Sequence, residues 1–415
     1  MKEADIAAVR AELEEFVGDV FASLPRADQR AKGSLYLRGL MLDGKRKSMQ
    51  PMAERLGVDF QQLQQFVSSS QWRIEPVRRV IATRATETIT PEAWVIDDTG
   101  FKKDGASSPG VARQYSGTLG KIGNCQIGVS IHLATDTASC PVNWRLFIPE
   151  SWDDTCAETN EDAERIHARR DRSRLPDTAR NQTKWSMGLE MIDQLISWHL
   201  TPPTLVGDAG YGNATGFRLG LTKRHISYVL AVTFSTTAYP DSTRPETTST
   251  RPRLARYRTP ALSLKELALA AGRAQAQHVR WRKGTQTSPD NPAANMESDF
   301  LTLRIRAANR DIPLNNDGSL PAEWLLVEWP KDQTEPTDYW LSTLPETTPI
   351  AELVRLAKMR WRIEHDYREL KTGLGLAHFE GRTWLGWNHH ATLVSAAHLF
   401  LTTLRLTHPK ASGAA

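Results

Sequence analysis

The stretch that decides the fold class runs from residue 94 to residue 149 and reads WVIDDTGFKKDGASSPGVARQYSGTLGKIGNCQIGVSIHLATDTASCPVNWRLFIP. Four of its segments are rich in β-branched and aromatic residues, which favour strands: WVIDD, VARQYSG, CQIGVSIHLAT and CPVNWRLFIP. Gly, Pro, Ser and Asp separate these segments and are typical of turns. Consecutive strands joined by short connections predict an antiparallel meander.

The chain after the meander alternates between helix and strand patterns. Residues 151–183 are highly charged and are typical of solvated helix or loop. A helix pattern then covers 184–200, an apolar strand pattern covers 204–212, and a brief helix leads to a further strand at 225–232. Antiparallel strands followed by strand, helix and strand predict an α/β fold with an RNase H-like sheet.

A low-complexity stretch interrupts this expected core. Residues 235–260 are rich in Ser, Thr, Pro and Arg and favour no regular element. Strand-like pieces follow: HVRWRKG, DFLTLRIRAA, EWLLVEWP and DYWLSTL. The pattern predicts a β-rich insertion at 236–345, between a first core part at 91–235 and a last core part at 346–415 that ends in a C-terminal helix.

An all-helical segment, residues 1–90, precedes the core. Two short helical patterns flank Gly57, as in a helix-turn-helix. The stretch 26–84 holds twelve basic and five acidic residues, a net charge of +7, whereas the whole chain carries only +4. We expect a DNA-binding domain here, although an ordinary helical bundle with a solvated basic face is an equal alternative. The side chains expected to contact phosphates are Lys45, Arg46 and Lys47.

Composition and chain ends restrict the compartment. The three cysteines, Cys125, Cys140 and Cys156, form no close pair and no metal-type spacing, which favours a reducing cytoplasm and argues against zinc. No apolar run approaches the roughly 18 residues that span a bilayer. The start, MKEADIAAVRAELEEF, is typical of an acidic amphipathic helix rather than of a signal peptide. We expect a cytoplasmic protein without a membrane partner.

Two candidate catalytic carboxylates follow apolar strand patterns. Asp97 and Asp98 come directly after Trp-Val-Ile and are expected to end this strand just before a Thr-Gly turn. Only one of the two can point into a given site because strand side chains alternate. Asp97 is preferred, because Asp98 with Thr99 has the chemistry of a turn or cap. Asp208 follows Leu-Val in the same way. Plain turns at both places are the alternative interpretation.

The third candidate carboxylate, Glu364, lies in the expected helix ELVRLAKMRWRIEHDYRELKTGLGL, whose apolar residues recur at three- and four-residue steps. A neighbouring stripe of this helix carries Arg360, Glu364, Arg368 and Lys371. Such a stripe is either a solvated salt-bridge network or a metal ligand beside cations that hold phosphates. Glu369 lies on another face and is the weaker candidate.

The three acids taken together predict a catalytic site, whereas each alone also fits a turn or a salt bridge. Asp97, Asp208 and Glu364 occur in the order Asp, Asp, Glu on strand, strand and helix, as a two-metal phosphoryl-transfer site requires. Hard oxygen ligands suit two Mg²⁺ ions, for which Mn²⁺ can substitute. We therefore predict a metal-dependent phosphoryl-transfer site.

At these residues the chain resembles the DDE-superfamily transposases of bacterial insertion sequences, in the group with a β-strand insertion before the final Glu. Their signature Tyr-x2-Arg-x3-Glu-x6-Lys matches Arg360, Glu364 and Lys371, with Ala357 in the place of the Tyr. Tyr367 or the neighbouring arginines are candidates for the missing tyrosine's phosphate contact. The blocks DDTGFKKDG, GVARQYSGTLGKIGNCQIGVS and HFEGRTWLGWNHHATL are also similar to those of one subgroup.

The resemblance implies a function and its partners. It implies binding of terminal inverted repeats, metal-dependent cleavage, and strand transfer into target DNA, all by a homodimer on paired ends of double-stranded DNA at the bacterial nucleoid. It places Trp281 against a flipped base, with strand packing as the alternative. Cations that it places along the DNA path, or that are merely solvated, are Lys102, Lys103, Arg113 and Lys121.

Two other functions fit parts of this pattern. One is an RNase H-like nuclease that cuts DNA without transposition. The other is a domesticated DNA-binding protein without catalysis, against which the complete set of three acids argues, because acids repel phosphate unless metals neutralise them. A metal hydrolase of small molecules does not explain the basic helical segment.

Overall fold

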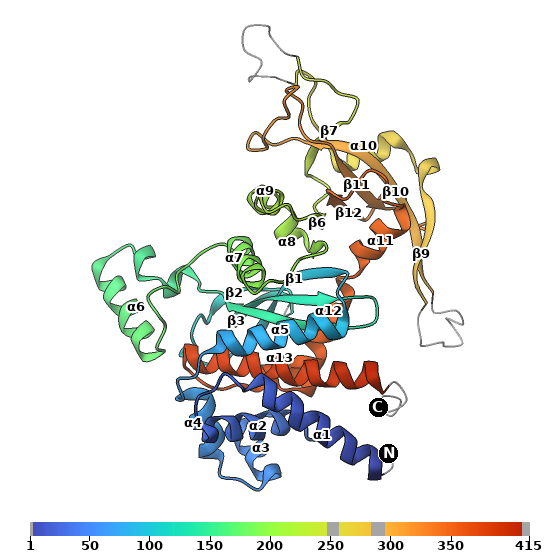
Figure 1. Ribbon diagram of the computed structural model, residues 1–415. Coiled ribbons are helices and arrows are strands. Elements are labelled where there is room, and N and C mark those ends of the chain that lie inside the picture. Colours follow the sequence, from blue (N-terminus) through green and yellow to red (C-terminus); the bar gives the residue numbers. More distant parts are fainter. Residues whose placement is uncertain (1–2, 119, 247–256, 284–294, 409–415) are drawn as a thin grey trace. The chain divides into compact units, whose positions relative to one another are not determined.

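The structure is a computed structural model that describes residues 3–118, 120–246, 257–283 and 295–408 (Figure 1). The chain divides into two compact units. The first comprises Met1–Glu92, Ile96–Thr201 and Arg362–Ala415, and the second comprises Ala93–Val95 and Pro202–Trp361. Helices and strands mix in both, so the α/β prediction is confirmed. No helix in the described ranges is long and apolar enough to cross a membrane.

The first unit begins with five helices, as the pattern of residues 1–90 predicted. Gly57 ends the third helix in the left-handed conformation, with φ of 67°, and Asp59 caps the fourth through the backbone N–H of Gln61. The helices are α1 (Glu3–Val20), α2 (Ala27–Met41), α3 (Met49–Leu56), α4 (Phe60–Ser68) and α5 (Ile74–Ile89). They pack in the same compact unit as the meander, so the expected boundary near residue 90 does not separate two units.

The predicted meander forms the sheet of the first unit. Its strands are β1 (Ala93–Lys102), β2 (Ala112–Ser116), β3 (Lys121–Ala134) and β4 (Ser139–Leu146). The long strand β3 pairs antiparallel with β2 through residues 121–125 and with β4 through residues 128–134, and β1 lies along its other side. The antiparallel prediction is confirmed for these pairs.

One prediction about β1 is wrong, because the strand does not stop at the two aspartates. It continues through Asp97 and Asp98 to Lys102. The following Thr-Gly is no turn, since Thr99 and Gly100 are buried within the strand. A Cβ on Gly100 would lie 1.9 Å from the Oγ of Ser116, so the glycine permits a close approach of neighbouring chain segments.

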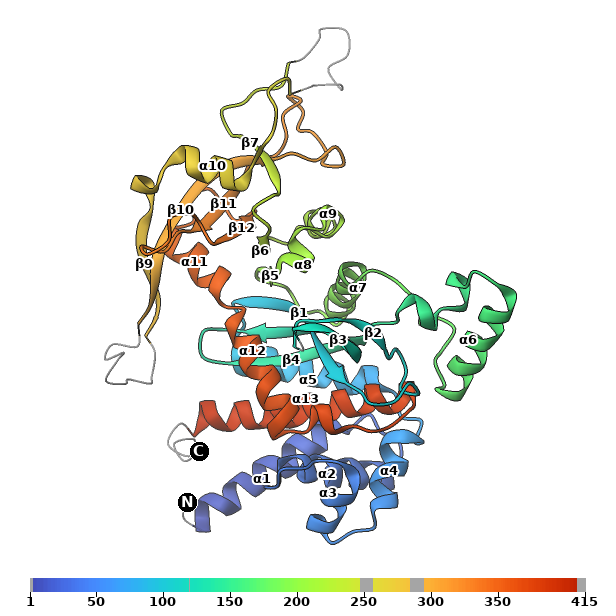
Figure 2. The same cartoon turned by 180° about the vertical axis from the view of Figure 1, so that it is seen from behind.

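Helices cover both faces of this sheet. Trp144 donates its indole N–H to Ser395 of α13 (Trp384–Thr407) at 2.9 Å, whereas its neighbour Asn143 donates to Gln194 of α7 (Lys184–Ser197) at 3.0 Å. Adjacent strand residues point to opposite faces, so α13 and α7 lie on different sides. Figure 2 shows α13 and α5 side by side beneath the strands. The charged stretch 151–183 contains η1 (Glu150–Trp152), η2 (Asp154–Cys156) and α6 (Asn160–Arg172).

The second unit contains the strand, helix and strand predicted after the meander. The strands β5 (Leu205–Gly207) and β6 (Tyr228–Val232) are parallel, and α8 (Ala209–Gly212) and α9 (Thr215–Lys223) connect them. The backbone N–H of Trp94, from the start of β1, donates to the Thr204 carbonyl at 2.9 Å. A parallel pair joined by helices agrees with the predicted order of elements, and the RNase H-like assignment stays a prediction.

The segment 236–345 is β-rich, as predicted, and its strands continue the sheet that begins with β5 and β6. The order is β5-β6-β12-β11-β10-β7-β8, with β9 also paired to β10. The elements are β7 (Thr237–Pro240), β8 (Leu262–Ser263), α10 (Leu264–Ala271), η4 (Arg273–Gln275), β9 (Gln277–Lys283), β10 (Asn295–Ala307), β11 (Glu323–Glu328) and β12 (Asp338–Ser342). Parts of the expected insertion, 247–256 and 284–294, lie outside the described residues.

The single helix expected around Glu364 is interrupted, which corrects that prediction. It forms α11 (Ile350–Lys358), a turn, α12 (Trp361–Arg368), a π-helical turn η5 (Glu369–Gly373) and η6 (Leu376–His378). The backbone N–H of Met359 donates to Leu356, three residues back, which tightens the chain at the break. Arg360 therefore belongs to the second unit and Glu364 to the first, so the predicted stripe is not continuous.

Candidate active site

The structure places two of the predicted acids in the first unit and one in the second. Asp97 lies in β1 with 6% of its surface exposed, and Glu364 is exposed in the first turn of α12. Asp208 caps α8 in the second unit, where its carboxylate accepts the backbone N–H groups of Gly210 and Tyr211. Among the described residues no three His, Cys, Asp or Glu side chains form a complete metal site. The three-acid site remains a prediction.

The two neighbouring aspartates of β1 have different surroundings. The Oδ1 of Asp97 accepts the backbone N–H of Asp98 at 2.7 Å, and its side chain is buried. The carboxylate of Asp98 instead forms an ion pair with the Lys184 ammonium of α7 at 2.9 Å. Because the two side chains leave the strand on opposite faces, this ion pair supports the choice of Asp97 for the site.

The helix that carries Glu364 faces β1 at Asp97. Tyr367 lies one turn after Glu364; burial raises the pKa of its phenol, and the negative charge of Asp97 raises it further. Lys371, on the π-helical turn, donates to the Gly100 carbonyl at 2.9 Å. Burial lowers the pKa of Lys371 to about 8, and the charge of Asp97 partly opposes that shift. A carboxylate, a phenol and an ammonium therefore meet beside β1.

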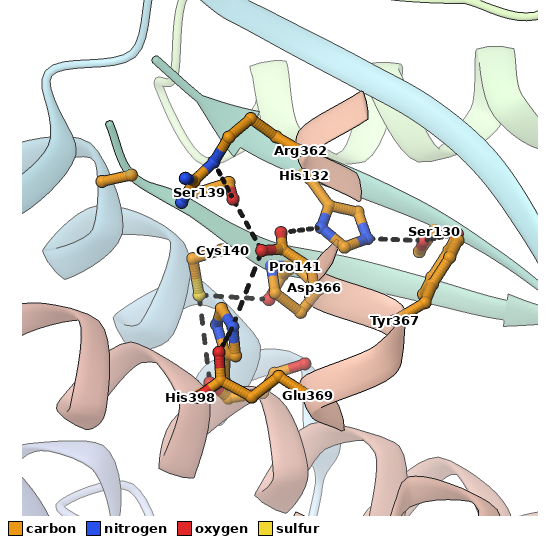
Figure 3. A network of polar contacts seen from close by, with 12 residues as sticks. Ser130, His132, Ser139, Cys140, Pro141, Arg362, Asp366, Tyr367, Glu369 and His398 are labelled. Atoms are coloured by element: carbon orange, nitrogen blue, oxygen red, sulfur yellow. Dashed lines mark hydrogen bonds and ion pairs between the residues drawn. The ribbon is translucent and has the colours of Figure 1, made fainter. Parts of the chain in front are cut away.

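A buried polar chain holds α12 against the sheet (Figure 3). The Tyr367 hydroxyl lies 2.7 Å from the Ser130 hydroxyl, which lies 2.9 Å from the Nε2 of His132. The Nδ1 of His132 lies 3.0 Å from one oxygen of Asp366, whose other oxygen accepts the Ser139 hydroxyl at 2.7 Å. We call Ser130, His132, Ser139, Asp366 and Tyr367 the buried polar chain.

The protonation of this chain follows from its surroundings. Burial lowers the pKa of His132, which keeps the imidazole neutral. Neutral His132 then donates through Nδ1 to Asp366 and accepts at Nε2 from Ser130, whose oxygen accepts from Tyr367. The burial of Asp366 acts to raise its pKa, but the hydrogen bond from His132 and further partners outweigh this effect and lower it. Every hydrogen-bond donor of the buried polar chain therefore has an acceptor within it.

The Ser130, His132 and Asp366 arrangement has the connectivity of a hydrolase triad, but its burial excludes that role. Ser130 and His132 have no exposed surface, and 1% of Asp366 is exposed. A nucleophile must reach its substrate. The Ser130 hydroxyl also contacts the Tyr367 hydroxyl, which lies beside the candidate site. These residues therefore position α12.

Glu369, the weaker candidate acid, is engaged elsewhere. The Nη1 of Arg405, on α13, donates to the Glu369 carboxylate at 2.9 Å, and the Nη2 of Arg405 contacts its other oxygen. The Nε2 of His398 lies 3.6 Å from the same carboxylate. Its burial acts to raise the pKa, but the nearby His398 and the hydrogen bonds from Arg405 outweigh this and lower it well below the usual range. Glu369 thus connects the π-helical turn to α13.

The predicted DNA-contacting cations separate into two groups. The side chains of Lys45, Arg46, Lys102, Arg113, Lys121 and Arg368 are exposed, although Arg46 pairs with Glu380. Lys47 is only 4% exposed and donates its ammonium to the Leu42 carbonyl, and Lys103 donates to the Phe379 carbonyl at 2.7 Å. Burial lowers the pKa of both lysines. Both ammonium groups therefore already have a backbone acceptor, and the predicted contacts of Lys47 with phosphates and of Lys103 along the DNA path stay predictions.

Trp281 and Arg360 lie in the second unit. Trp281 packs edge-on against Phe300 of β10, with ring centroids 5.6 Å apart, and the Lys358 ammonium lies 5.1 Å from its ring centroid. These contacts fit the strand-packing interpretation. Arg360 is half-buried in the turn between α11 and α12. Neither placement tests a contact with DNA.

The sequence reasoning missed a buried arginine that joins the N-terminal helices to the sheet. Arg78 of α5 is 2% exposed and donates to the Trp144 carbonyl of β4 and to Thr392 of α13, both at 2.8 Å. Its neighbour Arg79 is exposed and cannot be told apart from it by charge alone. The burial of Arg78 could have been predicted from its position on the helix face that carries Val77, Ile81 and other apolar residues at helical spacing.

Comparison with known proteins identifies the family. Residues 19–288, well over half of the chain, match the family described as DDE superfamily endonuclease. The chain is also 26% identical over 198 residues, 47% of its length, to the "Probable transposase for insertion sequence element IS701" of Microchaete diplosiphon. That match covers 46% of the relative, so the chain spans about half the length of this curated protein. The chain belongs to the DDE superfamily of endonucleases.

Proposed function

We propose that this protein is a transposase that cleaves DNA at the ends of an insertion sequence and joins the freed end to target DNA. The observation that carries the proposal is the buried carboxylate of Asp97, held on β1 of a DDE-superfamily chain with the Glu364 helix facing it. The similar protein of Microchaete diplosiphon is itself described as a probable transposase. Binding of terminal inverted repeats and action as a homodimer on paired ends belong to the same proposal.

The donor atoms fit a hard divalent cation. Asp97, Asp208 and Glu364 offer only carboxylate oxygens, which Mg²⁺ and Mn²⁺ prefer. When bound, two such ions supply an activated water or hydroxyl and stabilise the leaving oxygen. The strand under Asp97 and the cap position of Asp208 hold these two carboxylates in fixed orientations. Glu364 is exposed at the start of α12.

The chain's own cations orient the DNA in this proposal. Lys371 lies beside Asp97 and remains largely protonated at neutral pH, because its pKa is about 8. Arg368, exposed one turn after Glu364, is placed to contact a phosphate near the same site. The exposed Lys45 and Arg46 of the basic N-terminal segment contact the duplex farther along. Phosphate contacts of this kind fix the register of the DNA without reading its sequence.

The experiment that tests the proposal separates cleavage from joining. The wild-type protein is incubated with Mg²⁺, a labelled duplex that carries the element's end, and a supercoiled target plasmid. Joined products support a transposase, because an endonuclease alone cuts the duplex and leaves the plasmid unlinked. Cleavage without joined products supports the nuclease alternative. Binding without either reaction, from wild-type protein supplied with Mg²⁺ or Mn²⁺, supports the non-catalytic alternative and contradicts the proposal.

A further inference from the structure

The hairpin formed by β2 and β3 exposes two large apolar side chains that face each other. Tyr115 pairs directly with Ile122 across the two strands, and they are 64% and 61% exposed. In the described part of the chain no other large apolar side chain is as exposed as these two. Isolated exposed apolar residues are ordinary, but two that are opposed on one strand pair form a continuous surface. This surface favours a contact with another molecule.

Two exposed cations lie close to Tyr115 and Ile122 in the sequence of the hairpin. Arg113 precedes Tyr115 by two residues, so it lies on the same face of β2, and it is exposed. Lys121, next to Ile122 at the start of β3, is exposed as well but points to the other face of the hairpin. The sequence from Gly105 to Thr135 contains no acidic residue. An apolar pair with an exposed arginine on the same face is complementary to a nucleic acid, which presents flat base faces between rows of phosphates.

The hairpin also adjoins the candidate active site. The Oγ1 of Thr118, just after β2, lies 3.2 Å from the Lys371 ammonium and 3.2 Å from the Thr99 hydroxyl. It accepts the backbone N–H of Gly100 at 3.3 Å. Thr99 is two residues from Asp97 in β1. A DNA strand that reaches Asp97 therefore passes close to the end of this hairpin.

We propose that Tyr115 and Ile122 form an apolar wedge that packs against base faces of the DNA beside the phosphate held at Asp97. Arg113, on the same face as the pair, contacts a flanking phosphate. The proposal rests on the proposed action on DNA and adds a contact that the metal-binding acids do not provide. Apolar side chains that enter a base step unstack it, so this wedge favours DNA in which a step is already weakened.

Binding to two duplexes of the same length tests this wedge. One is fully paired and the other has a central mismatch, and both carry a fluorescent label for anisotropy, with Ca²⁺ in place of Mg²⁺ to prevent cleavage. We expect the wild-type protein to prefer the mismatched duplex. Tyr115→Ala should weaken binding to it about tenfold and abolish the preference, whereas Tyr115→Phe should keep both. Arg113→Ala should weaken binding to both duplexes and reduce the salt dependence by about one phosphate contact.

The matched control is Leu269→Ala, which removes another exposed apolar side chain, from α10 in the second unit. It should bind both duplexes like the wild type. If Tyr115→Ala also binds both like the wild type, the wedge is wrong while the proposed cleavage activity stands. If Tyr115→Ala and Ile122→Ala instead dissociate a dimer in sedimentation without changing DNA binding, a second copy of the chain covers the pair and the wedge is again wrong. A wild-type protein that binds neither duplex contradicts the proposed function itself.

Discussion

The Nδ1 of His132 lies 3.0 Å from the Oδ2 of Asp366, and both side chains are buried between β3 and α12. The contact joins a strand that lies beside β1 to the helix that carries Glu364. Asp366 and Glu364 are two residues apart on α12 and therefore lie on different sides of the helix, so the contact with His132 holds the side opposite Glu364. A loss of this contact therefore affects both stability and the placement of Glu364.

Asp366→Asn should lower the free energy of unfolding by about 2 to 3 kcal/mol. The amide keeps the shape of the side chain but removes a charge and places an N–H group opposite hydrogen-bond donors, which leaves buried polar atoms unpaired. Urea unfolding followed by circular dichroism measures this change. Ser139 also donates to Asp366, so Ser139→Ala, which removes one hydrogen bond and keeps the His132 contact, should cost less than Asp366→Asn.

The control for Asp366 is a similar pair on the surface. His278 and Asp299 also lie 3.0 Å apart, but 46% of the His278 side chain is exposed. Asp299→Asn should lower the free energy of unfolding by less than about 1 kcal/mol, because water screens the pair and replaces its hydrogen bond. Equal losses for the two substitutions would show that burial of the His132 and Asp366 pair adds no stability.

His390 should make the protein less stable as the pH falls below about 6.5. Burial lowers its pKa to about 4, while the unfolded chain keeps the ordinary value of about 6.5. Between these values the unfolded state binds a proton that the folded state does not, so stability decreases as the pH falls through this window and levels off below about 4. Each pKa unit corresponds to about 1.4 kcal/mol.

The test of His390 compares the slope of stability against pH in two variants. His390→Gln should flatten the slope between about pH 6.5 and about pH 4. It also loses contacts with the Tyr36 hydroxyl at 2.9 Å and the Gly375 carbonyl at 3.1 Å, which lowers stability at neutral pH. His167→Gln, at an exposed position on α6, removes a histidine away from this buried site and is the matched control. A slope that is the same in His390→Gln as in the wild type would contradict the lowered pKa.

Gly100→Ala should destabilise the first unit by about 1 to 3 kcal/mol. The added Cβ would lie 1.9 Å from the Oγ of Ser116 and 2.8 Å from its Cβ, so β1 and the end of β2 must separate. Gly105→Ala is the matched control, because a Cβ there meets nothing within 4 Å. Combining Gly100→Ala with Ser116→Gly should recover most of the loss. If the double variant is no more stable than Gly100→Ala, the clash with Ser116 is not the cause.

Gly100 also shows why sequence reasoning placed the end of β1 wrongly. The Thr-Gly pair after Asp98 has the composition of a turn. Its glycine is explained by Ser116, which lies sixteen positions later, and local patterns do not reveal such a contact. The four meander segments were predicted correctly because their β-branched and aromatic residues are local features.

Parts of the candidate site could be predicted only where a residue stands in a recognisable strand or helix pattern of its own. Asp97, Asp208 and Glu364 were predicted from the order of acids on strand, strand and helix, and the site that they would form stays a prediction. The buried polar chain was missed, although Ser130 and His132 occur two positions apart in the apolar strand CQIGVSIHLAT and so share one face. Their partner Asp366 comes from a distant helix, and two polar residues inside a strand do not indicate which helix supplies it. The break at Met359 was missed because its residues continue the helical spacing.

Asp97→Asn and Asp98→Asn should separate the catalytic aspartate from its neighbour. We expect Asp97→Asn to reduce DNA cleavage with Mg²⁺ by more than the roughly 10- to 100-fold typical of residues that only support a metal ligand. Asp98 points to the other face and pairs with Lys184, whose side chain is 32% exposed. Asp98→Asn should therefore cost less than about 1 kcal/mol of stability and leave cleavage within a few-fold of the wild type.

Both variants keep the size of the side chain, so circular dichroism and DNA binding should match the wild type and show that folding is intact. Glu364→Gln and Asp208→Asn should behave like Asp97→Asn if the three acids act on the same metal ions. Restored activity with Mn²⁺ in Asp97→Asn alone would favour Asp97 as a direct ligand, since a change of metal compensates for a changed ligand. If Asp98→Asn loses cleavage while Asp97→Asn retains it, the first acid is Asp98, and the face of β1 that holds the metal is the one that α7 covers.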